Sequence, residues 1–115
     1  MLIGELARRT GSSARSLRHY DGCGLLPAAR TRAGYRDFPP EAVARVGAIR
    51  GLLACGLTLA EIRTLLPCTT AAGAIRACSD VLASLVEHLN RLDVRAAEID
   101  LARQIIREHL VSLST

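Results

Sequence analysis

Apolar and polar positions near the start of the chain follow the spacing of two short helices. The predicted apolar face of the first helix consists of Ile3, Leu6 and Ala7. Gly11 is placed to end this helix in a left-handed conformation. A second helix begins at a cap on Ser12 or Ser13 and extends to about Tyr20, with Ala14 and Leu17 on its apolar side. Two short helices joined by a glycine-containing turn predict a helix-turn-helix.

The helical spacing disappears over residues 22–38, where glycines and a proline interrupt a basic run, and we expect a β-hairpin wing there. A third helix is predicted to open with Pro39, Pro40 and Glu41 and to end at Gly56. Its predicted buried face consists of Val43, Val46, Ile49, Leu52 and Leu53. Residues 58–61 have the sequence of a capping box, so a fourth helix begins there and stops before Pro67.

A heptad pattern dominates the rest of the chain, from Ala74 to the end, after a linker of small residues at 67–73. One row of the heptad is Leu85, Leu92, Ile99, Ile106 and Leu113. The companion row is Leu82, Leu89, Ala96 and Leu110, interrupted only by Arg103. Polar residues flank both rows, and this favours a helix that pairs with a second copy of the chain. A helix lying on the core of its own subunit is the alternative.

Charge is distributed unevenly along the 115 residues. Residues 1–66 carry ten arginines against five acidic residues, whereas residues 67–115 carry five against six. All fifteen basic residues are arginine, whose planar guanidinium suits phosphate oxygens and base edges. The basic N-terminal half therefore predicts a polyanionic partner.

Several classes of protein are excluded by what the sequence lacks. The longest stretch without a charged residue is the twelve residues 64–75, shorter than the roughly 20 apolar residues of a membrane span. The N-terminus has no signal-peptide pattern, so we expect a cytoplasmic protein that does not contact the membrane. No nucleophile–base arrangement, carboxylate pair or phosphate-binding glycine loop stands out. We therefore predict that the chain is not an enzyme and needs no cofactor.

Five motifs, in order along residues 1–66, resemble the MerR family of transcriptional regulators. They are Ile-Gly-Glu-Leu-Ala at 3–7, Ser-Leu-Arg-His-Tyr-Asp at 16–21, Gly-Leu-Leu-Pro at 24–27, Gly-Tyr-Arg at 34–36 with Phe38, and Gly-Leu-Thr-Leu-Ala-Glu-Ile at 56–62. The resemblance implies a homodimer that binds an inverted repeat in double-stranded promoter DNA and distorts it, affecting RNA polymerase indirectly.

The expected fold is mainly α. It consists of a winged helix-turn-helix in residues 1–70, followed by a dimerisation helix in 71–115 that forms an antiparallel coiled coil in the dimer. The dimer contacts are assigned to Leu82, Leu85, Leu89, Leu92, Ala96, Ile99, Ile106 and Leu110. No C-terminal effector domain is expected.

The predicted DNA contacts come from the second helix and the wing. They are Ser13, Arg15, Ser16, Arg18, His19, Tyr20, Arg30, Arg32, Tyr35 and Arg36. Arg15 and Arg18 suit guanine or phosphate in the major groove, whereas the wing residues suit phosphate. Arg18 and Tyr20 also match DNA-contacting positions of the family. Tyr20 and Tyr35 are alternatively core aromatics, and His19, which stands where the family more often has tyrosine, is alternatively a plain surface residue.

The effector is left open by the sequence. Cys78 stands where metal-sensing relatives place their first thiolate, but no cysteine follows it, and the usual ligand loop is missing. A metal- or thiol-responsive regulator using Cys78 and Cys68 remains an alternative, although we expect no high-affinity metal site. A helical dimerisation module that does not bind DNA is the competing interpretation from another class.

Overall fold

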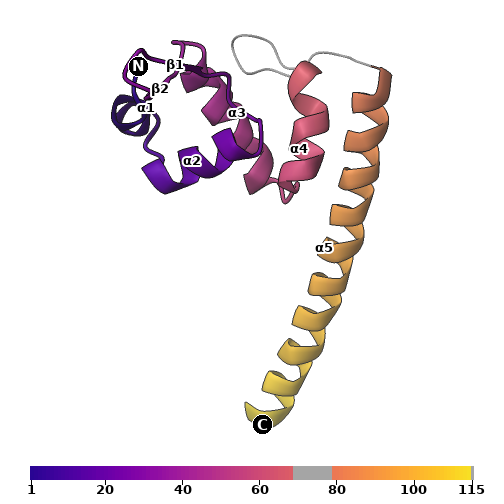
Figure 1. Ribbon diagram of the computed structural model, residues 1–115. Helices are drawn as coiled ribbons and strands as arrows, with labels where there is room; N and C mark the ends of the chain where they lie inside the picture. The colour runs from indigo at the N-terminus through magenta and orange to yellow at the C-terminus, as the bar shows by residue number, and fades with distance from the viewer. Residues whose placement is uncertain (69–78, 115) are drawn as a thin grey trace. The chain divides into compact units, whose positions relative to one another are not determined.

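The computed structural model describes residues 1–68 and 79–114, which belong to two compact units, 1–77 and 78–115 (Figure 1). We call residues 1–68 the head. Its elements are α1 (Ile3–Thr10), α2 (Ala14–Gly22), β1 (Ala29–Arg30), β2 (Arg36–Asp37), α3 (Ala42–Ala54), α4 (Leu59–Leu65) and the 3-10 turn η1 (Leu66–Cys68). The second unit contains one long helix, α5 (Ser79–Ser114). The mainly helical fold is confirmed.

The helix-turn-helix forms because both of its junctions carry a local signal. Gly11 adopts a φ of 70° and its N–H donates to the carbonyl of Ala7 at 2.9 Å, which ends α1. Ser13, the second of the two candidate caps, accepts a hydrogen bond from the N–H of Ser16 at 3.1 Å. Helix α2 continues to Gly22, two residues beyond its predicted end.

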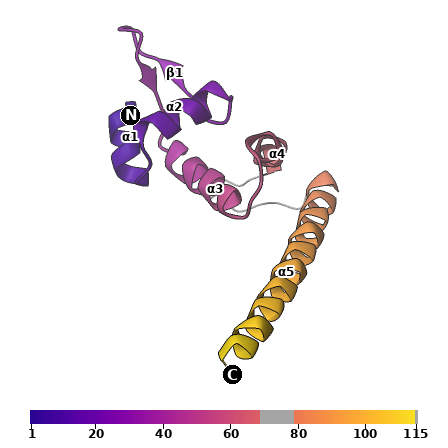
Figure 2. The ribbon, with the colours of Figure 1, turned by 90° about the horizontal axis from the view of Figure 1, so that it is seen from below.

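The wing is a two-stranded antiparallel hairpin that pairs Ala29 with Asp37 and Arg30 with Arg36. At its tip the N–H of Gly34 donates to the carbonyl of Thr31 at 2.9 Å, and Gly34 has a φ of 86°, which suits glycine. Figure 2 shows the hairpin projecting from the head beside α1 and α2.

The base of the wing is fixed to the start of the chain. The amide of Phe38 donates to the carbonyl of Met1 at 2.7 Å, and the Met1 ammonium donates to the carbonyl of Phe38 at 2.6 Å and to Asp37 at 2.9 Å. These bonds secure the wing beside the start of α1.

The predicted start of the third helix was wrong by three residues. Pro39 and Pro40 form a turn, in which the N–H of Ala42 donates to the carbonyl of Pro39 at 3.0 Å, and α3 begins only at Ala42. The last residue of α3 is Ala54, and Gly56, with a φ of 85°, follows the C-cap Cys55 as the glycine predicted to end the helix. Helix α4 begins at the predicted capping box, in which Thr58 and Glu61 each accept a hydrogen bond from the other's N–H.

The core of the head is mainly aliphatic and includes the aromatic rings of Phe38 and Tyr20. Its largest fully buried side chains are Phe38, Leu6, Leu17, Leu25, Ile49, Ile62 and Val46. Ala42 is also fully buried, whereas Val43, Leu52 and Leu53 of the predicted face are only half-buried. The sequence pattern missed Ala42 because a single methyl group adds little to a hydrophobic periodicity.

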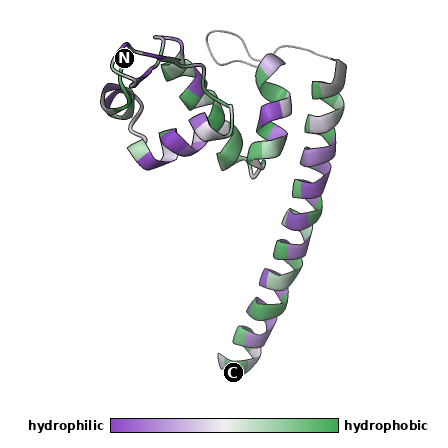
Figure 3. Ribbon diagram, viewed as in Figure 1, coloured by the Kyte–Doolittle hydropathy of each residue, from purple (hydrophilic) through white to green (hydrophobic). Residues whose placement is uncertain are grey.

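Helix α5 has 36 residues and is therefore about 54 Å long. The part of the predicted helix at 74–78 and the linker from 69 onward lie outside the described residues. Figure 3, in which the ribbon is coloured by hydropathy, shows hydrophobic and hydrophilic residues interspersed along α5. None of the described helices combines the length and apolar character that crossing a membrane requires.

Candidate nucleic-acid interface

Helix α2 divides into a buried face and an exposed polar face. Leu17 is fully buried, whereas Arg15, Arg18 and His19 are exposed. Ser16 is half-buried, and its hydroxyl accepts a hydrogen bond from that of Ser13 at 3.0 Å. The two serine side chains are therefore linked at the start of the helix. The arginines and the histidine thus reach solvent from a helix held rigidly by the core.

The two tyrosines predicted at the site differ in exposure. Tyr20 is 8% exposed and belongs to the core of the head, which favours the alternative that the sequence left open for it. Tyr35 is 65% exposed on the wing, and the core alternative is wrong for this residue.

The wing loop is braced by internal hydrogen bonds and carries one free guanidinium, that of Arg32, at its tip. Arg30 Nη1 donates to the carbonyl of Gly34 at 2.8 Å, which braces the turn from within. Two further hydrogen bonds join Thr31 and Tyr35. The N–H of Thr31 donates to the carbonyl of Tyr35 at 2.7 Å, and the N–H of Tyr35 donates to the hydroxyl of Thr31 at 3.2 Å. Arg32 is exposed between these bonds.

Arg36 is engaged with Asp21 of α2. Arg36 Nε donates to Asp21 Oδ2 at 2.8 Å, and Nη2 donates to Oδ1. The hydrogen bond to Asp21 raises the pKa of Arg36 further above its ordinary value, although partial burial opposes this shift. The sequence indicated Arg36 as a phosphate contact and gave no sign of this pairing.

Several other arginines of the head are engaged in holding it together. Arg9 pairs with Glu5 at 2.8 Å, Arg50 Nη1 donates to the carbonyl of Thr10 at 2.8 Å, and Arg63 donates to the carbonyl of Cys23. Within residues 1–68, the arginines without such a bond are Arg8, Arg15, Arg18 and Arg32. Apart from Arg8, these arginines are predicted DNA contacts on α2 and the wing, so uncompensated charge gathers on that surface.

Two surface grooves border α2. One, of about 550 Å³, lies between the start of α1, α2 and the wing, and its lining includes Leu2, Ile3, Arg18, Tyr35 and Phe38. The other, of about 620 Å³, is lined by Arg15, Ser16, His19, Tyr20, Leu53 and Leu59. Sequence reasoning missed Leu2, whose side chain is 49% exposed beside Arg18 and Tyr35, because it precedes the first helix and belongs to no periodic pattern.

The cysteines are only partly described. Cys23 is half-buried and Cys55 is exposed. The Cys68 side chain and the whole of Cys78 lie outside the described residues, so the thiol-based alternative stays untested. Among the residues that are described, no three His, Cys, Asp or Glu side chains gather as metal ligands would.

A capped helix-turn-helix followed by a basic hairpin defines the class of winged helix-turn-helix proteins. The family model of MerR helix-turn-helix regulatory proteins matches residues 1–68, and that of the MerR DNA-binding region matches residues 43–113. The chain belongs to the MerR family of helix-turn-helix regulatory proteins.

Individual relatives agree with this assignment. The chain is 34% identical over 114 residues to the transcriptional regulator HmrR of Sinorhizobium medicae, covering 97% of this chain and 75% of HmrR. It is 38% identical over 107 residues to the nodulation protein NolA of Bradyrhizobium elkanii, covering 92% of this chain. It spans 45% of that NolA, less than half of its length.

A solved structure confirms the fold over both units. The N-terminal part of the multidrug transporter activator of Bacillus subtilis, MtaN, superimposes with a TM-score of 0.74 at 29% identity, covering 96% of this chain and 97% of MtaN. The predicted combination of a helix-turn-helix head with a long C-terminal helix is therefore a known arrangement.

Proposed function

We propose that the chain binds an inverted repeat in promoter DNA as a homodimer and distorts the duplex, thereby controlling transcription. DNA binding is assigned to residues 1–70 and dimerisation to residues 71–115. The observation that carries the proposal is the grouping of unpaired guanidiniums on the exposed face of α2 and at the tip of the wing.

Helix α2 is the element that suits the major groove. Its exposed face carries Arg15 and Arg18, whose guanidiniums can donate two parallel bonds to guanine or single bonds to phosphate. The hydroxyls of Ser13 and Ser16 lie at the start of the same helix. His19 adds a ring nitrogen on this face. The largely buried Tyr20 contributes mainly by fixing the helix on the core.

The wing suits the neighbouring sugar–phosphate backbone. Arg32 and Tyr35 are exposed on the wing, and the Arg30 bond to Gly34 braces the loop that carries them. Contacts to phosphate position a protein on DNA without reporting sequence. The wing therefore adds affinity, while α2 adds sequence preference.

Helix α5 is assigned to dimerisation because most residues of its heptad rows are exposed, although Leu85 and Leu92 are half-buried. Leu89 and Ile99 are each 55% exposed, and Ile106 is 59% exposed. A lone helix gains most of its stability by burying such a stripe. A second copy of α5, running antiparallel, offers the same apolar stripe for pairing. The two heads of such a dimer are related by twofold symmetry, which matches the symmetry of an inverted repeat.

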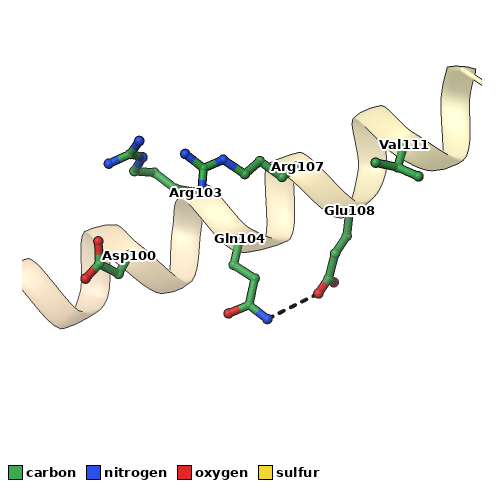
Figure 4. A pocket seen from close by; sticks show the side chains of 6 residues that line it. All are labelled: Asp100, Arg103, Gln104, Arg107, Glu108 and Val111. Atoms are coloured by element: carbon green, nitrogen blue, oxygen red, sulfur yellow. Dashed lines mark hydrogen bonds between the residues drawn. The ribbon is translucent and has the colours of Figure 1, made fainter.

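Arg103 interrupts the stripe in an open depression formed by α5 alone, lined by Asp100, Arg103, Gln104, Arg107, Glu108 and Val111 (Figure 4). Gln104 Nε2 donates to Glu108 Oε1 at 3.3 Å along the helix. Figure 4 shows Arg103 and Arg107 extending together from one side of α5. A polar position within an apolar seam can fix the register of two paired helices, at a cost in stability.

The proposal is tested by selecting duplexes from fragmented genomic DNA with the purified chain at physiological salt. We expect a preferred fragment that contains an inverted repeat, and an affinity that falls steeply as salt rises, because Arg–phosphate contacts release counterions. A chain that bound selected and random duplexes equally would contradict the proposal.

The division between α2 and the wing is tested with two arginine variants. Arg18→Ala should weaken binding of the selected duplex by about 1–3 kcal/mol and relax its base preference. Arg32→Ala should weaken binding to selected and random duplexes alike and reduce the salt slope by about one. Equal loss of preference in both variants would contradict this division of roles.

A further inference from the structure

The ion pair between Asp21 and Arg36 connects the two parts of the proposed interface. Asp21 lies in the last turn of α2, and Arg36 is the first residue of β2. Two hydrogen bonds join the guanidinium to both carboxylate oxygens. Such a bidentate pair fixes the orientation of the two groups as well as their distance.

The surroundings of the pair are the residues that face DNA in the proposal. The Asp21 side chain is 17% exposed and that of Arg36 is 36% exposed, so the pair is partly shielded from water. Both side chains line the groove that Arg18 and Tyr35 also line. Arg36 is in addition the strand partner of Arg30. A shift of Arg36 would therefore move the wing relative to α2.

We propose that the Asp21–Arg36 pair is a positioning device that holds the wing at a fixed distance from α2, and that Arg36 is not itself a phosphate ligand. This inference rests on the proposed function. The pair has no net charge, and the Nε and Nη2 donors of Arg36 are already committed to Asp21. The wing phosphates are left to Arg32 and Tyr35.

The Asp21→Asn variant separates the two roles of Arg36, because they predict opposite results. If Arg36 contacts phosphate, releasing it and removing a carboxylate should tighten binding to every duplex. If the pair positions the wing, the preference for the selected over a random duplex should fall by at least about fivefold, although the protein has become more positive.

Glu5→Gln is the matched control. Glu5 lines the same groove and pairs with Arg9 within α1, so the variant makes the same change of charge without loosening the wing. It should retain the preference of the wild type. The exchange variant Asp21→Arg with Arg36→Asp restores an ion pair at the same place and should recover most of the lost preference. Thermal unfolding of each variant verifies that the head remains folded.

A distance measurement tests the pair without DNA. Spin labels are attached through His19→Cys on α2 and Ala33→Cys at the wing tip, both exposed positions, with the four native cysteines changed to serine. Asp21→Asn should broaden the distance distribution between the labels, and Glu5→Gln should not. An unchanged distribution in Asp21→Asn, or an undiminished duplex preference, would overturn the inference. If the wild type showed no duplex preference, the proposed function would be contradicted. The label distances would still test whether the Asp21–Arg36 pair positions the wing.

Discussion

The head and helix α5 use similar apolar side chains in opposite ways. In the head, Leu6, Leu17 and Ile49 are completely buried. In α5, Ile99 and Leu110 are 55% and 60% exposed within the single chain. The head therefore obtains its stability from its own core, whereas α5 presents surface that a globular protein normally covers. The comparison separates residues that build the fold from residues that are available for association.

The largest effect is expected where an exposed heptad residue becomes charged. Ile99→Asp would place an unpaired carboxylate in the seam and should cost several kcal/mol of dimer association. Sedimentation equilibrium at micromolar concentration measures the result, and we expect monomers with a folded head.

Leu101→Asp is the control for this variant. Leu101 is 58% exposed, nearly the same as Ile99, but lies about 200° away around the helix. It should leave the dimer intact. If both variants dissociated equally, the two predicted rows would not be the dimer contact.

The second effect concerns the core of the head. Ile49→Ala removes a fully buried side chain and should lower the free energy of unfolding by about 2–5 kcal/mol, because a cavity remains. The matched change in α5 is Ile105→Ala at a side chain that is 45% exposed, and it should alter the free energy by no more than about 0.5 kcal/mol. Urea unfolding followed by circular dichroism compares the two. Similar losses would mean that α5 packs more tightly than the single chain indicates.

The smallest effect is expected at the capping box. Thr58→Ala removes the acceptor for the N–H of Glu61 and should cost about 1 kcal/mol of head stability. Thr64 lies in the same helix, and its hydroxyl only donates to the carbonyl of Glu61. Thr64→Ala should therefore change the melting temperature less than Thr58→Ala does. The reverse order would show that the cap is not what stabilises α4.

Local signals explain why much of the head could be predicted from the sequence. Gly11, Ser13 and the Thr58–Glu61 box make hydrogen bonds only to residues a few positions away. Each of these helix caps is present at a position that the sequence predicted. The predicted start of α3 was wrong because proline is common both in the first turn of a helix and in the kind of turn that Pro39 and Pro40 form here.

The candidate site was less predictable because its geometry depends on contacts between distant residues. Asp21 and Arg36 are fifteen positions apart, and no local pattern links an acidic residue at a helix end to an arginine in a strand. The burial of Tyr20 did have a signal, since it lies three residues after Leu17 on the same helical face.

The flanks of α5 also departed from the sequence pattern. Large apolar side chains outside the two rows are exposed as well, at Val86, Val94, Leu101, Ile105 and Val111. A heptad pattern identifies the residues of one helix face and does not predict how exposed the apolar residues on the other faces are. The apolar surface of α5 is therefore wider than the predicted seam.

The central claim is that the head binds DNA and that α5 joins two heads. The stoichiometry of the complex with the selected duplex tests this claim most directly, by analytical ultracentrifugation of labelled DNA with the wild type and with Ile99→Asp. We expect two chains on each duplex for the wild type, and a much weaker, stepwise binding of single chains for Ile99→Asp. One chain per duplex in the wild type, with the same affinity in the variant, would contradict the account.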